Sequence, residues 1–297
     1  MHQIKVLLRA TRLPFLILTP ICVFLGFSTA YRSQAGIDYI DLSLILLGAV
    51  CAHISVNSLN EYLDFHSGLD ARTKRTPFSG GSGALIDQPQ ANRNVLLVAL
   101  TTLGITILVG GYFIYHQGML ILPIGVLGIL IILTYTQWIN RHPILCLLAP
   151  GVGFGPLMVM GTAAILSGSY SLPALVVSLV PLFLVSNLLL LNQLPDIEAD
   201  KSVGRYHLPI AYGWRVSTIV YAVFAAASGV SIVAGVAMGF VPTAGYAALI
   251  PLSGTLVVMF AITKHGMKID RLIPYLGMNV FITLATPLLL GITLISN

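Results

Sequence analysis

The chain has 297 residues, of which 57% are hydrophobic and only 8% are charged. Its mean hydropathy of +0.92 excludes an ordinary soluble globular protein and indicates an integral membrane protein. The formal net charge of +5 needs no nucleic-acid partner, because a membrane protein retains basic residues in its cytoplasmic loops.

The apolar runs predict an all-α protein with about nine helices that span the lipid bilayer in one bundle. A helix needs roughly 20 apolar residues to cross a hydrocarbon core about 30 Å thick. The runs cover residues 12–31, 41–62, 94–115, 119–139, 144–165, 171–193, 215–238, 242–262 and 272–295. Because no long polar linker separates them, residues 1–297 are predicted to form a single integral-membrane domain.

The basic residues predict the orientation of these helices. If the N-terminus is cytoplasmic, all fifteen lysines and arginines except Arg32 fall in cytoplasmic segments. The positive-inside rule describes this asymmetry, and an error of one helix would destroy it. The sequence therefore predicts a cytoplasmic N-terminus, an external C-terminus and a functional site on the cytoplasmic side.

Two clusters contain six of the ten acidic residues, and each closes a long apolar run. The first contains Asn60, Glu61, Asp64 and Asp70, and the second contains Asn192, Asp196, Glu198 and Asp200. Carboxylates are costly beside a membrane, so their concentration indicates a binding site for cations. Four predicted helices separate the clusters, which indicates a parallel four-helix repeat with a ninth helix added, unless the match is a coincidence.

The spacing within the clusters predicts facing sets of oxygen ligands. Asn60 and Asp64 are four residues apart and share one face of a helix. Asp70 cannot share that face on a straight helix, but Gly68 can break the helix and return Asp70 to the site. The second cluster predicts a polar stripe on one helix face formed by Asn192, Asp196 and Asp200.

The chemistry of these groups points to a metal-bound diphosphate. Oxygen ligands without histidine or cysteine at ligand spacing suit Mg²⁺, which often shares itself with substrate phosphates. Basic residues that follow the clusters are expected to bind the outer phosphate oxygens: Arg72, Lys74, Arg75, Lys201 and Arg205. A diphosphate in a membrane pocket indicates an isoprenoid, whose allylic carbon could be captured by an aromatic ring.

Other residues around the clusters leave alternatives open. The glycine-rich residues 80–83 either fold over the site or form a flexible connector. His53, seven residues before Asn60, is either a base beside the acceptor or a hydrogen-bonded interior residue. Four aromatic side chains could shield a cation or simply pack: Tyr62, Phe65, Tyr135 and Trp138.

The two clusters resemble the aspartate-rich motifs of the UbiA-type intramembrane prenyltransferases, whose fold also has nine helices. The resemblance extends to residues 9–14, 75–82 and 153–158. It implies that four aspartates are catalytic residues and Mg²⁺ ligands: Asp64, Asp70, Asp196 and Asp200. It also implies that Asn60 and Asn192 contact the metal or the diphosphate.

The gap between Asp64 and Asp70 and residues 196–201 look most like the 1,4-dihydroxy-2-naphthoate polyprenyltransferases of menaquinone synthesis. That similarity implies transfer of a polyprenyl group from its diphosphate to the naphthoate, with loss of CO₂, in a bacterial inner membrane. Glu61 stands where aspartate is common, and residues 148–151 lack a frequent Gly-Glu pair. The acceptor therefore stays open among the naphthoate, 4-hydroxybenzoate, another phenol, haem and a lipid.

An ion-coupled transporter is the alternative from a different functional class. Its carboxylates would bind the coupling ions, and two parallel halves would rock around them. Transporter sites lie near the middle of the bilayer, however, whereas both clusters are expected at one membrane face. The sequence therefore favours the enzyme.

Overall fold

The computed structural model describes residues 2–296, which contain helices and no β-strand. The first half contains α1 (His2–Ala10), α2 (Leu13–Leu16), α3 (Leu18–Arg32), α4 (Tyr39–Ser67), α5 (Ala84–Asp87), η1 (Pro89–Ala91), α6 (Asn92–Gln117), η2 (Gly118–Ile121) and α7 (Leu122–Thr134). The second half contains η3 (Ile139–Arg141), α8 (Pro143–Val152), η4 (Gly153–Met160), α9 (Gly161–Ser167), α10 (Leu172–Asn192), α11 (Ile197–Ser202), α12 (Leu208–Ala237), η5 (Thr243–Ala248), α13 (Leu249–His265) and α14 (Ile269–Ile295).

Eight segments of the described chain are long and apolar enough to cross a membrane. One of them, Pro89–Thr134, has 46 residues and contains two of the predicted helices, α6 and α7. These two are separated at η2, which begins at Gly118 with a φ of 76°. Each of the nine predicted helices therefore has a counterpart, and the prediction of an all-α membrane bundle is confirmed.

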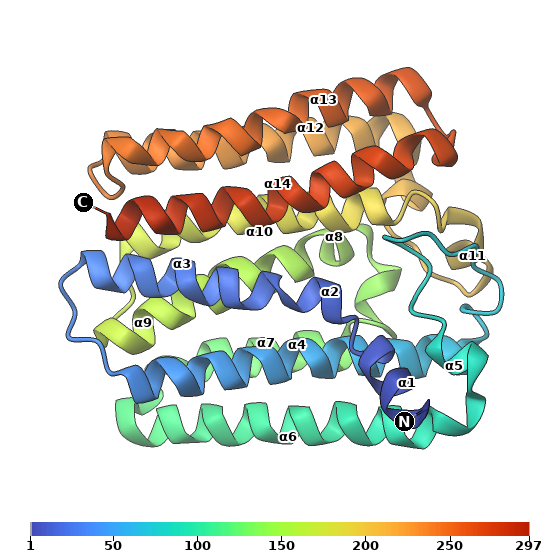
Figure 1. Ribbon diagram of the computed structural model, residues 1–297, viewed down its shortest axis with the longest axis horizontal. Coiled ribbons are helices and arrows are strands. Elements are labelled where there is room, and N and C mark those ends of the chain that lie inside the picture. Colours follow the sequence, from blue (N-terminus) through green and yellow to red (C-terminus); the bar gives the residue numbers. More distant parts are fainter. Residues whose placement is uncertain (1, 297) are drawn as a thin grey trace.

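The long helices lie side by side along the longest axis of the molecule (Figure 1). Among them, α4 packs against α6, α10 against α12, and α14 against both α3 and α13. Helix α1 and the end of α14 lie at opposite ends of the bundle, as an odd number of crossings requires (Figure 1). The short helices α5 and α11 lie at the same end as α1.

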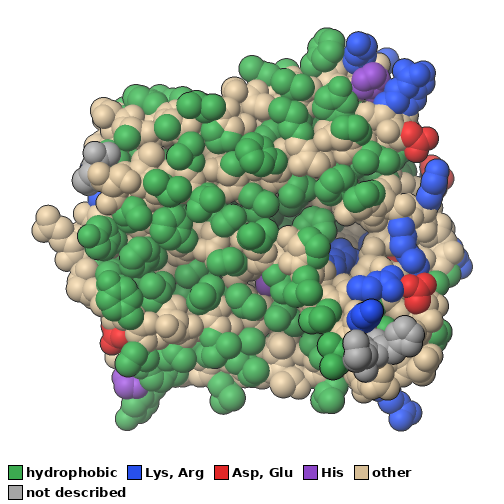
Figure 2. Space-filling view, viewed as in Figure 1, with side chains coloured by type: hydrophobic (Ala, Val, Ile, Leu, Met, Phe, Trp, Pro, Cys, Tyr) green, Lys and Arg blue, Asp and Glu red, His purple; other side chains and the backbone are tan. Residues whose placement is uncertain are grey.

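Apolar side chains fill the interior of the bundle and also cover its outside. Leu25, Leu184 and Leu290 are fully buried in the main core, which joins α3, α10 and α14. On the outside, Leu108 of α6 is 74% exposed and Ile250 of α13 is 73% exposed. Figure 2 shows hydrophobic side chains over most of one face. Such a surface is unfavourable in water and favourable in lipid, as expected of an integral membrane protein.

Helix α4 carries Asn60, Glu61 and Asp64 of the first acidic cluster in its last two turns and ends before Asp70. Gly68 ends the helix with a φ of 74°, a left-handed conformation that glycine adopts without steric cost. The chain leaves the helix at this point, and Asp70 lines the same cavity as Asp64. The prediction that Gly68 returns Asp70 to the site is therefore confirmed.

The second cluster does not lie on one helix, so that expectation was wrong. Helix α10 ends at Asn192, and α11 begins only at Ile197. Pro195 lies between them, and its lack of an N–H prevents helical hydrogen bonding from continuing. A turn therefore separates Asn192 from Asp196, although both residues line the same cavity.

The segment η4 is π-helical and interrupts the spanning run between α8 and α9. π-Helical turns are frequent at functional sites. Gly155 allows η4 to approach α10 closely, because a Cβ at this position would lie 2.5 Å from the backbone oxygen of Ser178. The adjacent Phe154 lines the cavity.

The orientation of the bundle in the membrane stays a prediction. Lys and Arg side chains gather at the end that carries α5 and α11, in agreement with a cytoplasmic location of that end (Figure 2). The single domain and the four-helix repeat also stay predictions. The pairing of α4 with α6 and of α10 with α12 is what such a repeat would require.

Candidate active site

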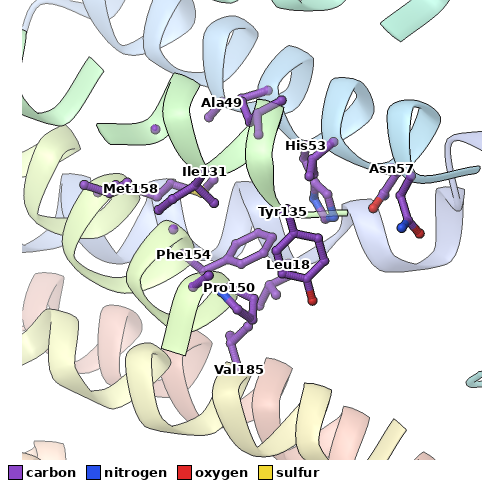
Figure 3. Close-up of a pocket in the computed structure, with 18 of the residues that line it drawn as sticks. Leu18, Ala49, His53, Asn57, Ile131, Tyr135, Pro150, Phe154, Met158 and Val185 are labelled. Carbon is purple, nitrogen blue, oxygen red and sulfur yellow. The ribbon is translucent and has the colours of Figure 1, made fainter. Parts of the chain in front are cut away.

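A cavity of about 630 Å³ connects the two acidic clusters with the apolar interior. Its walls come from α4, α6, α7, the α8 to α9 run and α10, with further residues from α2 and α3. In Figure 3, His53, Asn57, Tyr135 and Phe154 lie around one space, and Met158 lies farther along its wall. A polar end with an apolar extension suits an amphiphilic ligand.

The cavity brings together most of the site residues predicted from the sequence. Those that line it are Asn60, Asp64, Asp70, Asn192, Asp196, Asp200 and Arg205. Among the described residues, four predicted ligands of the phosphate oxygens do not line it: Arg72, Lys74, Arg75 and Lys201. The Arg72 guanidinium instead donates to the hydroxyl of Ser202, at 3.2 Å, across the loop surface. Tyr135 is the one predicted aromatic side chain that lines the cavity.

Arg205 joins the two acidic clusters directly. Its guanidinium forms ion pairs with Asp64 and with Oδ1 of Asp200, the latter at 2.9 Å. His207 Nε2 lies 3.0 Å from the other oxygen of Asp200. The Arg205 side chain is 17% exposed, so these charges interact in a partly desolvated environment. A single internal cation therefore compensates one carboxylate from each cluster.

Among the predicted site residues at this end of the cavity, three buried oxygen atoms have no hydrogen-bond partner within the described part of the chain. They are Oδ2 of Asp70, Oδ1 of Asn192 and Oδ1 of Asp196. Burial, and then the Glu61 and Asp64 carboxylates, raise the pKa of Asp70 to about 7. Burial, and then the Asp200 carboxylate, raise the pKa of Asp196 to about 7. A bound cation would favour the charged form of both carboxyl groups.

These partnerless oxygens fit Mg²⁺, which prefers oxygen ligands and retains several waters or substrate oxygens. Asp70 and Asp196 supply carboxylates, and Asn192 supplies a neutral amide oxygen. Across the described chain, no three acidic, histidine or cysteine side chains converge closely enough to hold an ion alone. Mg²⁺ is usually bound by one or two carboxylates together with substrate phosphates, and two carboxylates are what this donor set supplies.

The glycine-rich loop after the first cluster closes over the carboxylates. The Gly80 N–H donates to Oδ2 of Asp196 at 2.9 Å. A Cβ on Gly81, whose φ is 70°, would lie 2.6 Å from Oδ1 of Asp70. The fully buried Glu61 accepts hydrogen bonds from the backbone N–H groups of Ser82 and Ala84, at 3.1 and 3.2 Å. Glu61 therefore anchors the loop, and residues 80 and 81 reach both clusters.

Arg12 is a cavity residue that was not among the predicted site residues. It precedes α2 with a φ of 54°, and its guanidinium donates to Oδ1 of Asn60 at 3.1 Å. Arg12 belongs to residues 9–14, which are part of the family resemblance. That resemblance could therefore have identified Arg12 as a site residue from the sequence. Gln193 was also missed; its Oε1 is buried without a partner, and the residue lines the cavity.

His53 is held on the apolar side of the carboxylates. Its Nδ1 lies 2.8 Å from the hydroxyl of Thr19, and its ring contacts the edge of Phe154. Among the described residues, Nε2 of His53 has no hydrogen-bond partner, and the side chain lines the cavity. The residue is therefore a hydrogen-bonded interior histidine that also presents one ring nitrogen to a ligand.

Comparison with known proteins identifies the family. Residues 19–286 match the UbiA prenyltransferase family. The chain belongs to this family of prenyltransferases. The resemblance stated from the two acidic clusters is therefore confirmed.

Two curated relatives illustrate the similarity within this UbiA family. The chain is 29% identical to 1,4-dihydroxy-2-naphthoate octaprenyltransferase from Bacillus subtilis, over 64% of this chain and 61% of the relative. It is 30% identical to UbiA prenyltransferase domain-containing protein 1 from Rattus norvegicus, over 69% of this chain and 59% of the relative. The chain thus spans about 60% of the length of these relatives.

Solved structures share the fold over nearly the whole chain. The apo structure of a UbiA homologue from Aeropyrum pernix K1 has a TM-score of 0.71 and 18% identity, covering 95% of this chain and 97% of that one. A UbiA homologue from Archaeoglobus fulgidus, bound to DMAPP and Mg²⁺, has a TM-score of 0.65 and 15% identity, covering 98% and 99%. These likenesses show a common architecture.

Proposed function

We propose that this UbiA-family protein transfers a polyprenyl group from its diphosphate to an aromatic acceptor in an Mg²⁺-dependent reaction. The proposed acceptor is 1,4-dihydroxy-2-naphthoate, as in menaquinone synthesis. The naphthoate enzyme name of the Bacillus relative supports this acceptor. The proposed location is a bacterial inner membrane, with the polar end of the cavity at the cytoplasmic face.

The observation that carries the proposal is the set of partnerless oxygens of Asp70, Asn192 and Asp196 at one end of a largely apolar cavity. Buried polar groups without partners are costly, so this end is suited to a cation and its anionic ligand. The apolar continuation past Phe154 and Met158 suits a hydrocarbon tail. A polyprenyl diphosphate combines both features, and the A. fulgidus homologue is bound to DMAPP, which carries a single prenyl unit, and Mg²⁺.

In the proposed reaction, Mg²⁺ bound by Asp70, Asn192 and Asp196 would neutralise charge on the departing diphosphate. Arg12 and Arg205 lie beside the same end of the cavity and would bind the outer phosphate oxygens. Binding there requires the Arg205 guanidinium to exchange at least one carboxylate for a phosphate oxygen. The glycine-rich loop and the apolar walls would exclude water from the allylic carbon.

The acceptor would lie between His53 and the carboxylates. Nε2 of His53 would accept a hydrogen bond from an acceptor hydroxyl and increase the electron density of the ring. The C–O bond to the diphosphate breaks and its electron pair leaves with the diphosphate. Overall, the ring gains the prenyl group through a new C–C bond and, for the naphthoate, loses CO₂.

The test is an acceptor screen with purified protein. Polyprenyl diphosphates of several lengths are incubated with the naphthoate or 4-hydroxybenzoate, in Mg²⁺ or in EDTA, and product mass and diphosphate release are measured. We expect a decarboxylated prenyl naphthalenediol in Mg²⁺ and none in EDTA. A product from 4-hydroxybenzoate alone would identify 4-hydroxybenzoate, and not the naphthoate, as the acceptor. If no acceptor gave diphosphate release, the proposed prenyl transfer would be contradicted.

A further inference from the structure

A second cavity, of about 500 Å³, lies beside the first, between the segment after α4 and the start of α14. It is lined by residues 74–76, Pro195 and most of residues 267–273. Lys74 therefore belongs to this cavity rather than to the candidate active site. Nothing in the proposed prenyl transfer uses the second cavity.

Three basic side chains surround the second cavity: Lys74, Lys268 and Arg271. Arg75 also lines it, but its guanidinium packs against Gly83, which lies outside the lining. The single acidic residue in its lining is Asp270. Among the described side chains, these three cations and Asp270 form no ion pair. Three cations around one hollow repel one another, and a bound anion would reduce that repulsion. Arginine and lysine together are typical ligands of phosphate oxygens.

The start of α14 adds to this preference for an anion. The helix begins at Ile269, and no side chain caps its N-terminus, where the free N–H groups favour phosphate. Met267, Ile269 and Ile273 line the same cavity and give it an apolar side. The cavity therefore matches a phosphate group that is carried by an apolar molecule, such as the headgroup of an anionic phospholipid.

The two cavities share one wall. Thr76 lines the second cavity, and its backbone N–H donates to the Ser79 carbonyl at 3.2 Å. Ser79 and Gly80 line the candidate active site, where the Gly80 N–H binds Asp196. Pro195, next to Asp196, lines the second cavity. A ligand bound on the outer side of this wall would thus restrain the loop that closes the inner side.

We propose that the second cavity binds a phosphate group and that the bound phosphate holds residues 74–81 against the carboxylates of the candidate active site. The ligand joins the segment after α4 to the start of α14. The effect of the bound phosphate on activity rests on the proposed function, whereas the binding of phosphate to the second cavity does not. An anionic lipid and free phosphate share this chemistry, and the experiment distinguishes them.

The test compares the full-length wild type with the double variant Lys268→Gln/Arg271→Gln. A matched control, Arg93→Gln/Lys264→Gln, removes two exposed cations that do not line the second cavity. Native mass spectrometry measures retention of phosphatidylglycerol and of phosphatidylcholine. Hydrogen exchange of residues 74–81 is measured with each lipid and with inorganic phosphate, without any prenyl donor.

We expect the wild type and the control to retain phosphatidylglycerol about tenfold more strongly than the double variant, with slower exchange at residues 74–81. Protection by inorganic phosphate alone would support the site and identify free phosphate as its ligand. Equal retention of both lipids by all three proteins, with no protection of residues 74–81 by inorganic phosphate or with equal protection in the double variant, would overturn the proposal. Because no prenyl donor is present, this result is independent of the prenyl-transfer reaction.

Discussion

Arg205 shows what single residues contribute to this site. The sequence predicted it as a ligand for phosphate oxygens, and the structure pairs it with Asp64 and Asp200. Both carboxylates are almost completely buried, so each needs a cation nearby. Before substrate binds, Arg205 supplies that cation from within the chain. Its role as a phosphate ligand stays a prediction.

Replacing Arg205 should destabilise the protein in a metal-dependent way. Arg205→Gln leaves Asp64 and Asp200 without their cation, which typically costs about 3 kcal/mol for a buried pair. We expect a lower unfolding temperature in detergent, with a larger rescue by Mg²⁺ than in wild type. Arg215→Gln removes an exposed cation of α12 and is the control. Equal behaviour of the two variants would contradict the role given to Arg205.

Asp196 should be essential for turnover. Asp196→Asn removes a carboxylate that borders the cavity and has one partnerless oxygen. We expect the rate of prenyl transfer to fall by at least about 100-fold, since removal of one group that stabilises transition-state charge has effects of this size. Asp87→Asn alters an aspartate paired with Arg9 outside the cavity and should retain activity. Similar rates for the two variants would remove Asp196 from the site.

At the scale of elements, the positions at which helices end determine where the site residues lie. The positive φ of Gly68 returns Asp70 to the end of α4, and this break was predictable from the glycine. Pro195 also indicated a break in the helix, but the prediction from the sequence did not take it into account. It therefore placed the second cluster wrongly on one helix face. The short helix α1 was also missed, because its nine residues are too few for a membrane span.

The glycine-rich loop provides a test at this scale. Gly81→Ala introduces a Cβ that would lie 2.6 Å from Oδ1 of Asp70, at a φ of 70°. Gly168→Ala has a comparable φ of 76°, in the left-handed region, and no atom near the added Cβ. Each substitution should cost about 1 kcal/mol of stability through backbone strain. We expect only Gly81→Ala to lower the turnover rate, and an equal loss in both would contradict the contact.

The arrangement of the whole molecule places both clusters, α5 and α11 at one end of the bundle (Figure 1). The distribution of lysine and arginine predicts that this end is cytoplasmic. The number of helices and their approximate limits were predictable, because each apolar run is a local property of the chain. The pairing of α14 with α3 was not predictable, because it depends on packing between the two ends of the sequence.

The orientation can be tested with reporters fused to the chain. A fusion of green fluorescent protein after Gly266, in the turn between α13 and α14, should fluoresce if that turn is cytoplasmic. A fusion after Ile295 should stay dark, and alkaline phosphatase should show the reverse pattern, because it is active only outside the cytoplasm. Fluorescence at both positions would contradict the odd number of crossings.

The sequence by itself determined the membrane class, the nine helices and the two oxygen-rich clusters. These properties depend on hydropathy over about 20 residues and on spacings within one or two helical turns. Only the tertiary structure decided which cations meet the clusters: Arg12 and Arg205 line the cavity, whereas Lys74 lies in a separate one. Arg205 and Asp64 are 141 residues apart in sequence, and only packing of the complete bundle brings them together.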